Sequence, residues 1–167
     1  TFSEALRAGV EIFQSLKNLL SENSLSTAVG DEGGFAPNIS NLEEALSYIS
    51  RAIEKSGYKL GEEIFISIDA AASELYKKGF YHLSGENKKL NTDELFKYWE
   101  GICKKFPIVS IEDPFDENDW YGFNELTKVL GNKLQVVGDD LFVTNKKRLL
   151  KGIKENSGNA ILIKLNQ

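Results

Sequence analysis

The chain has 167 residues, of which 41% are hydrophobic and 27% are charged, and its formal net charge at pH 7 is −5. These proportions are ordinary for a globular protein, and the negative charge argues against a general nucleic-acid binder, so we expect no nucleic-acid partner. No apolar run is long enough to span a bilayer, and no signal peptide is visible. The single cysteine, Cys103, excludes an internal disulfide and favours a reducing compartment.

The first third of the chain predicts two helices separated by a glycine-rich loop. Residues 1–20 begin with Thr1 and Glu4 at capping-box spacing. Apolar side chains then recur at the helical period: Leu6, Val10, Phe13, Leu16 and Leu20. Asn41 and Glu44 cap the second helix. We expect its apolar side chains to point inward: Leu42, Ala45, Leu46, Ile49 and Ile53.

The remainder of the chain alternates strands with helices. Short runs rich in β-branched residues predict strands at 64–68, 108–111, 134–137 and 160–164. Amphipathic stretches predict helices from Thr92, at 120–130 and at 146–155, and residues 77–83 predict a small turn or hairpin. Such alternation is typical of βαβ units and a parallel sheet, so we expect an α/β fold of the (β/α) barrel kind. A complete barrel takes about 250 residues, and the chain opens on Thr1 rather than Met, so we expect residues 1–167 to be part of a larger protein.

Three carboxylates and one lysine stand at the ends of the four predicted strands: Asp69, Glu112, Asp139 and Lys164. In a (β/α) barrel all parallel strands end on one face, and the active site is built there. Ligands that are all oxygen suit a hard cation such as Mg2+. A lysine beside a cluster of metal-binding carboxylates is a candidate base. The pattern therefore predicts a metal site with a neighbouring base.

Each of these residues also has a purely structural interpretation. Asp69 is a good helix cap for the residues that follow it. Lys164 closes a run that we expect to be buried, and its long side chain can still reach solvent. Asp139 and Asp140 are adjacent, so only one of them points into the barrel mouth and the other is a cap or a supporting acceptor. Glu112 is a poor cap, and the coincidence of four such positions favours the metal site.

The segment Gly30–Asn38 is the second informative stretch. Its glycines flank Asp31 and Glu32, which predicts a backbone folded tightly around two presented carboxylates. On composition alone an ordinary acidic turn is the better explanation. The segment is not a phosphate-binding loop, because it lacks the lysine and the serine or threonine that such loops require.

Five motifs together resemble the enolase family. They are VGDEGGFAPN at 29–38, SIDAAASE at 67–74, SIEDPF at 110–115, VGDDLFVTN at 137–145 and IKLNQ at 163–167. They span essentially the whole chain in the order and spacing of the family, and their residues are similar to those of its bacterial members. The resemblance implies that residues 1–167 are a partial C-terminal barrel domain, with the N-terminal capping domain and the last barrel strands absent.

The resemblance also implies a function. Members of the family are glycolytic carbon–oxygen lyases that require Mg2+. They reversibly dehydrate 2-phosphoglycerate to phosphoenolpyruvate through a metal-stabilised enediolate. By resemblance, Asp69, Glu112 and Asp139 hold the metal. Lys164 is the base that removes the α-proton, and Glu32 is the general acid that helps to expel the hydroxyl group. The same resemblance places Glu32 and Lys164, together with Glu112 and Asp139, in contact with substrate.

The resemblance carries further expectations about the whole protein. It implies a cytoplasmic homo-oligomer of the full-length subunit, with a secondary cell-surface location as in bacterial enolases. Because the family's phosphate-binding segment lies outside these residues, we expect residues 1–167 alone to be inactive. Two alternatives are a non-catalytic paralogue and another enzyme of the superfamily that acts on a different carboxylate substrate. The loop Gly30–Asn38 argues against the second, and the presence of all five site residues argues against the first.

Overall fold

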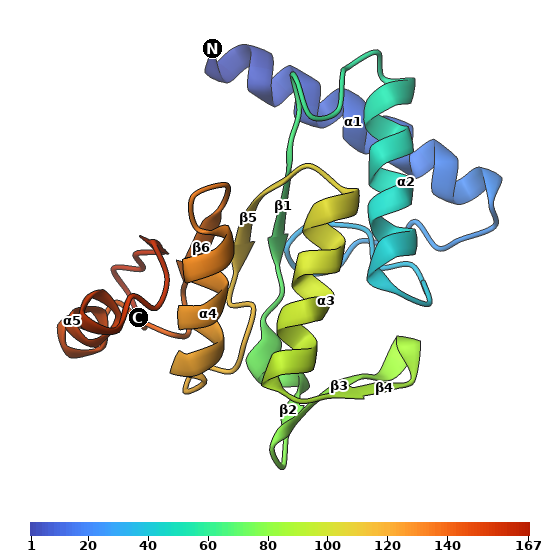
Figure 1. Cartoon of the computed structure of the whole chain (residues 1–167). Coiled ribbons are helices and arrows are strands. Elements are labelled where there is room, and N and C mark those ends of the chain that lie inside the picture. Colours follow the sequence, from blue (N-terminus) through green and yellow to red (C-terminus); the bar gives the residue numbers. More distant parts are fainter. The chain divides into compact units, whose positions relative to one another are not determined.

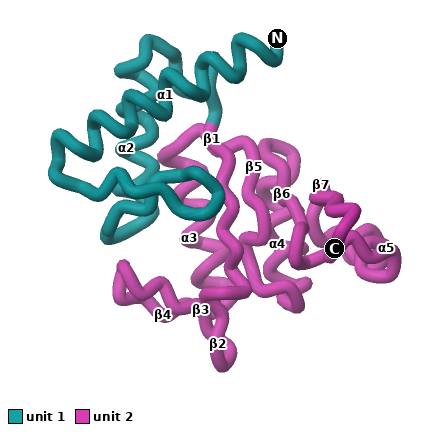
Figure 2. Tube along the Cα trace, turned by 180° about the vertical axis from the view of Figure 1, so that it is seen from behind, with its two compact units in different colours: residues 1–65 teal, residues 66–167 magenta.

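The computed structural model describes residues 1–167. It divides into two compact units, Thr1–Phe65 (unit 1) and Ile66–Gln167 (unit 2), which Figure 2 distinguishes by colour. Figure 1 labels the helices and strands. No helix combines the length and the apolarity that a bilayer crossing requires.

Unit 1 contains two long helices, α1 (Phe2–Glu22) and α2 (Leu42–Lys55). The predicted capping box of α1 is present: the Glu4 N–H donates to the Thr1 hydroxyl at 3.3 Å, and the Thr1 backbone amine donates to the Glu4 carboxylate at 2.7 Å. At the start of α2 the Glu44 N–H donates to the Asn41 side chain at 2.8 Å. Both helix starts are confirmed, because each cap satisfies backbone N–H groups that have no partner within the helix.

The predicted apolar stripe of α1 is only partly buried. Leu20 is 1% exposed, whereas Leu6 and Val10 are 58% and 53% exposed. In α2 the stripe lies as expected, with Leu46 and Ile53 each 2% exposed. The helical period therefore predicted both helices correctly but did not tell which end of the α1 stripe is covered.

Unit 2 is built on a parallel sheet of four strands. The strands are β1 (Ile66–Asp69), β5 (Ile108–Glu112), β6 (Gln135–Gly138) and β7 (Ala160–Ile161). They follow one another in the order β1-β5-β6-β7, and every neighbouring pair is parallel. The predicted parallel sheet is thus confirmed, and all four carboxyl ends meet at one edge of it. The sheet is open, as expected for part of a (β/α) barrel.

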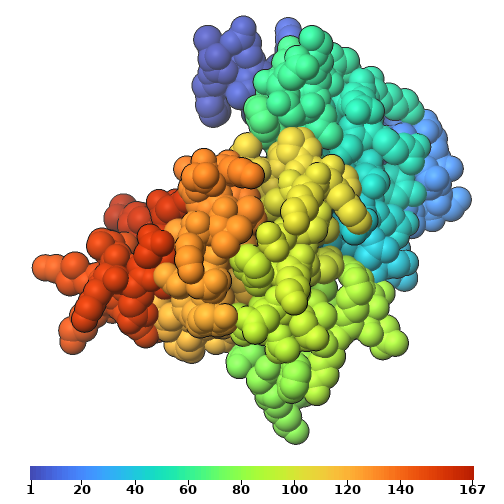
Figure 3. Space-filling view, in the orientation of Figure 1, coloured from blue at the N-terminus to red at the C-terminus, as the bar shows by residue number.

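The helices of unit 2 are α3 (Thr92–Lys105), α4 (Trp120–Leu130) and α5 (Lys146–Glu155). Figures 1 and 2 show α3 and α4 on the same face of the sheet, and Figure 3 shows these two helices side by side. Their inner sides, the strands and the segment between β5 and α4 form a buried apolar core: Leu95, Trp99, Ile102, Ile111, Phe115, Phe123, Leu126 and Val136. This core holds the sheet flat against its helices and so fixes the edge where the strands end.

A small antiparallel sheet follows β1. It consists of β2 (Tyr76–Lys77), β3 (Phe80–Leu83) and β4 (Lys88–Leu90), with short 3-10 turns at Ala72–Leu75 and Ser84–Glu86. The sequence predicted a turn or hairpin here and missed β4, which is short and carries two lysines. Tyr81 on β3 is fully buried, and its hydroxyl donates to the Asp119 carboxylate at 2.7 Å. Because Asp119 caps α4, this bond attaches the small sheet to the helical layer.

The last strand is shorter than predicted. The sequence predicted 160–164, whereas β7 ends at Ile161. The Leu162 N–H still donates to the Gly138 carbonyl at 3.1 Å, but β6 ends at Gly138 and offers no further partner. The chain then leaves the sheet, and Ile163 is 57% exposed. The expectation that Lys164 closes a buried run is therefore wrong.

The end of β6 has no room for a side chain at Gly138. A Cβ built there would lie 2.5 Å from the Phe142 ring. Gly138→Ala should therefore lower the free energy of unfolding by about 1–3 kcal/mol, the usual effect of overpacking a core. Gly101 on α3 is the control, because its Cβ would meet nothing within 4 Å and alanine is the better helix former by about 1 kcal/mol. Urea unfolding of both variants checks this, and equal losses of stability would contradict it.

The thiol of Cys103 on α3 is half-buried and free. Burial is the main reason why its pKa is raised to about 11. Because only the thiolate attacks disulfide reagents, we expect Cys103 to react at pH 8.5 roughly 100-fold more slowly than free cysteine. Denaturation should remove the difference. A reaction with 5,5'-dithiobis(2-nitrobenzoate), followed by absorbance, measures both rates, and equal rates in the folded protein would refute the expectation.

Candidate active site

The carboxyl edge of the parallel sheet brings together four of the five predicted site residues. Asp69 is the last residue of β1 and lies in register with Glu112, the last residue of β5. Asp139 directly follows β6, and Lys164 lies three residues beyond the end of β7. Parallel strands therefore deliver three carboxylates and one lysine to the same edge, as the sequence predicted.

Asp139 and Lys164 are in direct contact. The Lys164 Nζ forms a hydrogen-bonded ion pair with the Asp139 Oδ2. The other oxygen, Oδ1, accepts from the Gln167 side-chain amide at 3.2 Å. Asp139 is only 6% exposed, whereas 45% of the Lys164 side chain is exposed. The backbone N–H of Lys164 donates to the Thr144 hydroxyl at 2.9 Å, which holds the lysine segment beside the loop that follows β6.

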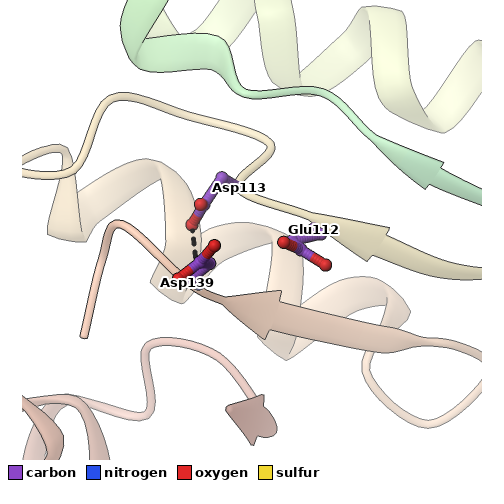
Figure 4. Close-up of side chains that lie close together, drawn as sticks. All are labelled: Glu112, Asp113 and Asp139. Atoms are coloured by element: carbon purple, nitrogen blue, oxygen red, sulfur yellow. Dashed lines mark hydrogen bonds between the residues drawn. The ribbon is translucent and has the colours of Figure 1, made fainter. Parts of the chain in front are cut away.

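Glu112 faces a second group of carboxylates. Single oxygens of Glu112, Asp113 and Asp139 all lie within 4.8 Å of one another, and Figure 4 shows the three side chains gathered at the ends of β5 and β6. Burial, followed by the negative charges of Asp69 and Asp139, raises the pKa of Glu112 to about 7. Crowded carboxylates of this kind repel one another, and a hard divalent cation relieves that repulsion. The donors present at this edge therefore fit Mg2+.

Asp69 lies beside this group rather than within it. Its side chain is exposed, and it accepts a hydrogen bond from the Ala71 N–H at 3.2 Å. An aspartate that binds the backbone two residues further on forms a local turn. Asp69 is not the helix cap of the structural interpretation, because Ala71 is the N-cap residue of the 3-10 turn that follows and no side chain caps it. Its position next to Glu112 keeps it available to the same site, and the set Asp69, Glu112 and Asp139 remains a prediction.

Asp113 is a residue that the sequence reasoning missed. Its carboxylate is 3% exposed and accepts three consecutive backbone N–H groups, from Asp139, Asp140 and Leu141, at 3.1, 2.8 and 3.4 Å. Burial raises the pKa of Asp113, although these N–H groups favour its charged form. The available signal was the acid directly after Glu112 and before Pro114, at a point where the chain must turn.

Glu32 lies in unit 1, at the tip of the predicted tight loop. The Gly30 N–H donates to the Gly34 carbonyl at 2.9 Å, and the Gly33 N–H donates to the Gly30 carbonyl at 2.9 Å. Gly33 has φ +80°, a conformation that glycine adopts without strain. Glu32 and its neighbour Asp31 are exposed on this turn. The expected backbone folded around presented carboxylates is confirmed, and the role of Glu32 as an acid stays a prediction.

The comparisons with known proteins bear on this arrangement as a whole. The family described as "Enolase, C-terminal TIM barrel domain" matches residues 1–167. The chain belongs to this family. It is 55% identical over 166 residues to proteins named enolase from Legionella pneumophila (strain Lens) and from Natranaerobius thermophilus. The alignments cover 99% of this chain and 39% of each relative, so the chain spans about two fifths of their length.

Enolase-family membership confirms two of the sequence-based predictions, the family resemblance and the partial (β/α) barrel. For the enolase family, the ion pair of Lys164 raises the question of which protonation state the lysine adopts. The hydrogen bond to Asp139 is the main reason why the pKa of Lys164 is raised. This contact favours the charged ammonium, whereas a base must be neutral to accept a proton. A cation held by Asp139 competes for the same oxygen and repels the ammonium, which would favour the neutral amine.

Proposed function

We propose that this chain supplies the metal-binding carboxylates, the base and the acid of an enolase, which reversibly dehydrates 2-phosphoglycerate to phosphoenolpyruvate. The observation that carries the proposal is the contact of Lys164 with Asp139 beside Glu112, because it joins a candidate base to candidate metal ligands at one sheet edge. The family match over the whole chain and the names of its relatives support the same chemistry.

In this proposal Asp69, Glu112 and Asp139 hold Mg2+. A proton next to a carboxylate is very weakly acidic, and its removal places a second negative charge on the carboxylate group. A bound Mg2+ supplies positive charge to the substrate carboxylate as that charge develops. The buried position of Asp139 strengthens every electrostatic interaction that its carboxylate makes, because little water competes there.

The two proton transfers fall to Lys164 and Glu32. Lys164 leaves the ion pair with Asp139 after giving one proton to solvent, and its neutral amine then takes the α-proton. Glu32 gives a proton to the departing hydroxyl group, which leaves as water. The electron pair of the broken C–H bond becomes the new double bond, so atoms and charges balance. Lys164 must therefore be a neutral amine and Glu32 a protonated acid when they act, as general acid–base catalysis requires.

The same proposal covers the setting of the whole protein. Mg2+ is its cofactor, and 2-phosphoglycerate and phosphoenolpyruvate are its substrate and product. The full-length subunit forms a homo-oligomer in the cytoplasm, with a secondary cell-surface location. These points rest on the family and not on any contact within residues 1–167.

The test is an assay of the complete protein that contains this chain. With 2-phosphoglycerate and increasing Mg2+, we expect ultraviolet absorbance from phosphoenolpyruvate to rise, and chelation of the metal to stop it. Absence of product at every Mg2+ concentration would refute the proposed reaction. Turnover that survives complete chelation would refute the metal site, and turnover of a different carboxylate in place of 2-phosphoglycerate would favour another activity of the superfamily.

A further inference from the structure

The buried carboxylate of Asp113 has no part in the proton transfers. It sits between Glu112 and Pro114 on the turn that leaves β5, with 3% of its surface exposed. A carboxylate so deeply buried needs partners, because burying an unpaired charge is costly. Its partners are all backbone groups of neighbouring elements of the sheet edge, and Figure 4 shows the hydrogen bond that reaches Asp139.

The side chain of Asp113 fixes the start of the loop after β6. Its Oδ1 accepts the N–H groups of Asp139 and Leu141, and its Oδ2 accepts the N–H of Asp140. Successive N–H groups that converge on one anion form a concave backbone nest. The direction of the Asp139 side chain depends on its own backbone, so the Asp113 carboxylate sets where that candidate ligand points.

The main chain of Asp113 is held equally firmly. Its N–H donates to the Val137 carbonyl of β6 at 3.0 Å, and its carbonyl accepts from the Ala72 N–H at 3.1 Å. Asp113 has φ +40°, in the left-handed region that few residues other than glycine adopt. Such a conformation persists when surrounding contacts determine it. Asp113 thus ties the turn after β5 to β6 and to the turn after β1.

The contacts distinguish a supporting role from a ligand role. Both oxygens of Asp113 are occupied by N–H donors of the loop at 139–141. The oxygens of Asp139, in contrast, face the side chains of Lys164 and Gln167. Three of the roughly four acceptor positions of the Asp113 carboxylate are therefore taken by backbone N–H groups, although one of its oxygens lies within 4.8 Å of Glu112 and Asp139.

We propose that Asp113 is a positioning residue: its carboxylate holds the backbone at 139–141 and thereby aims Asp139 at the cation. The proposal rests on the proposed Mg2+ site. Groups that orient metal ligands typically change metal affinity by about 10–100-fold when they are removed. Loss of the Asp113 carboxylate should therefore raise the dissociation constant for Mg2+ by that factor, while metal-saturated protein keeps much of its turnover.

The experiment is calorimetric titration of Mg2+ into the complete protein and two variants. Asp113→Asn keeps the shape of the side chain but turns one acceptor into a donor that faces backbone N–H groups. Asp113→Gly removes the acceptor and accepts φ +40° without strain, so it separates the carboxylate from the backbone conformation. Both variants should bind Mg2+ about 10–100-fold more weakly.

Asp119→Asn is the matched control. Asp119 also accepts three hydrogen bonds, from the Gly122 N–H, the Tyr81 hydroxyl and the Thr92 hydroxyl. These bonds join α4 to β3 and α3 and do not involve the loop after β6. We expect Asp119→Asn to lower the melting temperature and to leave the Mg2+ dissociation constant unchanged.

The outcomes distinguish failure of the positioning role of Asp113 from failure of the proposed Mg2+ site. Wild-type Mg2+ affinity in the folded Asp113 variants would overturn the positioning role, and so would an equal loss of affinity in Asp119→Asn, because it would indicate general destabilisation. If neither Asp113 variant folds, the residue serves the fold and the proposal also fails. Unchanged Mg2+ affinity in Asp139→Asn would instead overturn the proposed metal site itself.

Discussion

Replacement of Lys164 by alanine in the complete protein is expected to stop the exchange of the substrate's α-proton with solvent. In the proposed mechanism the Lys164 amine is the only group that takes this proton, and a general base typically contributes about 10²–10⁴-fold to a rate. Nuclear magnetic resonance of 2-phosphoglycerate in deuterated water, with Mg2+ present, follows the exchange directly. Exchange at the wild-type rate would remove Lys164 from the role of base.

Two further variants make this result specific. Glu32→Gln should slow dehydration but leave exchange in place, because exchange needs the base and the metal and not the acid. Lys151→Ala is the control for loss of a lysine, since Lys151 on α5 pairs with Glu155 and its Nζ lies over the Trp120 ring rather than on a candidate site residue. It should exchange normally. Loss of exchange in Glu32→Gln together with retention in Lys164→Ala would mean that the two roles are reversed.

The helices were predictable because their signals are local. The caps at Thr1 and Asn41 act within three residues of the chain, and the amphipathic pattern gave α4 and α5 the bounds found in the structure. The parallel sheet was predictable from the alternation of elements. These features depend on periodicity and capping, which a single sequence records.

The errors concern features that depend on distant partners. β4 forms because its backbone pairs with that of β3. β7 ends early because its partner strand, β6, ends at Gly138. Leu6 is exposed although it continues a helical stripe. No local pattern reports whether another segment covers a side chain or pairs with a backbone.

In the candidate site, too, local features were predictable and features that depend on distant partners were not. The order of polar residues at strand ends was predictable, since parallel strands share one edge. The direction of each side chain was not: Asp69 turns to its own backbone, and Lys164 pairs with Asp139. Asp113 escaped notice because its partners are backbone N–H groups of a loop more than twenty residues further on, and backbone groups carry no sequence signal.

The adjacent pair Asp139 and Asp140 allows the sharpest test of the metal assignment. Asp139 directly follows β6, is 6% exposed and contacts the candidate base. Asp140 contributes its backbone N–H to Asp113, a bond that alanine can make equally well. Asp139→Ala should therefore raise the Mg2+ concentration needed for activity by more than about 100-fold, beyond the usual effect of a supporting residue.

Asp140→Ala should have a much smaller effect and act only through the orientation of the loop. Both variants keep the backbone and lose one carboxylate, so each serves as the control for the other in net charge. Mg2+ titrations of dehydration, together with calorimetric Mg2+ binding, rank the two. Only Asp139 of the pair contacts the candidate base, so one residue of the pair should dominate. A stronger loss of Mg2+ affinity in Asp140→Ala than in Asp139→Ala would mean that Asp140, and not Asp139, is the metal ligand.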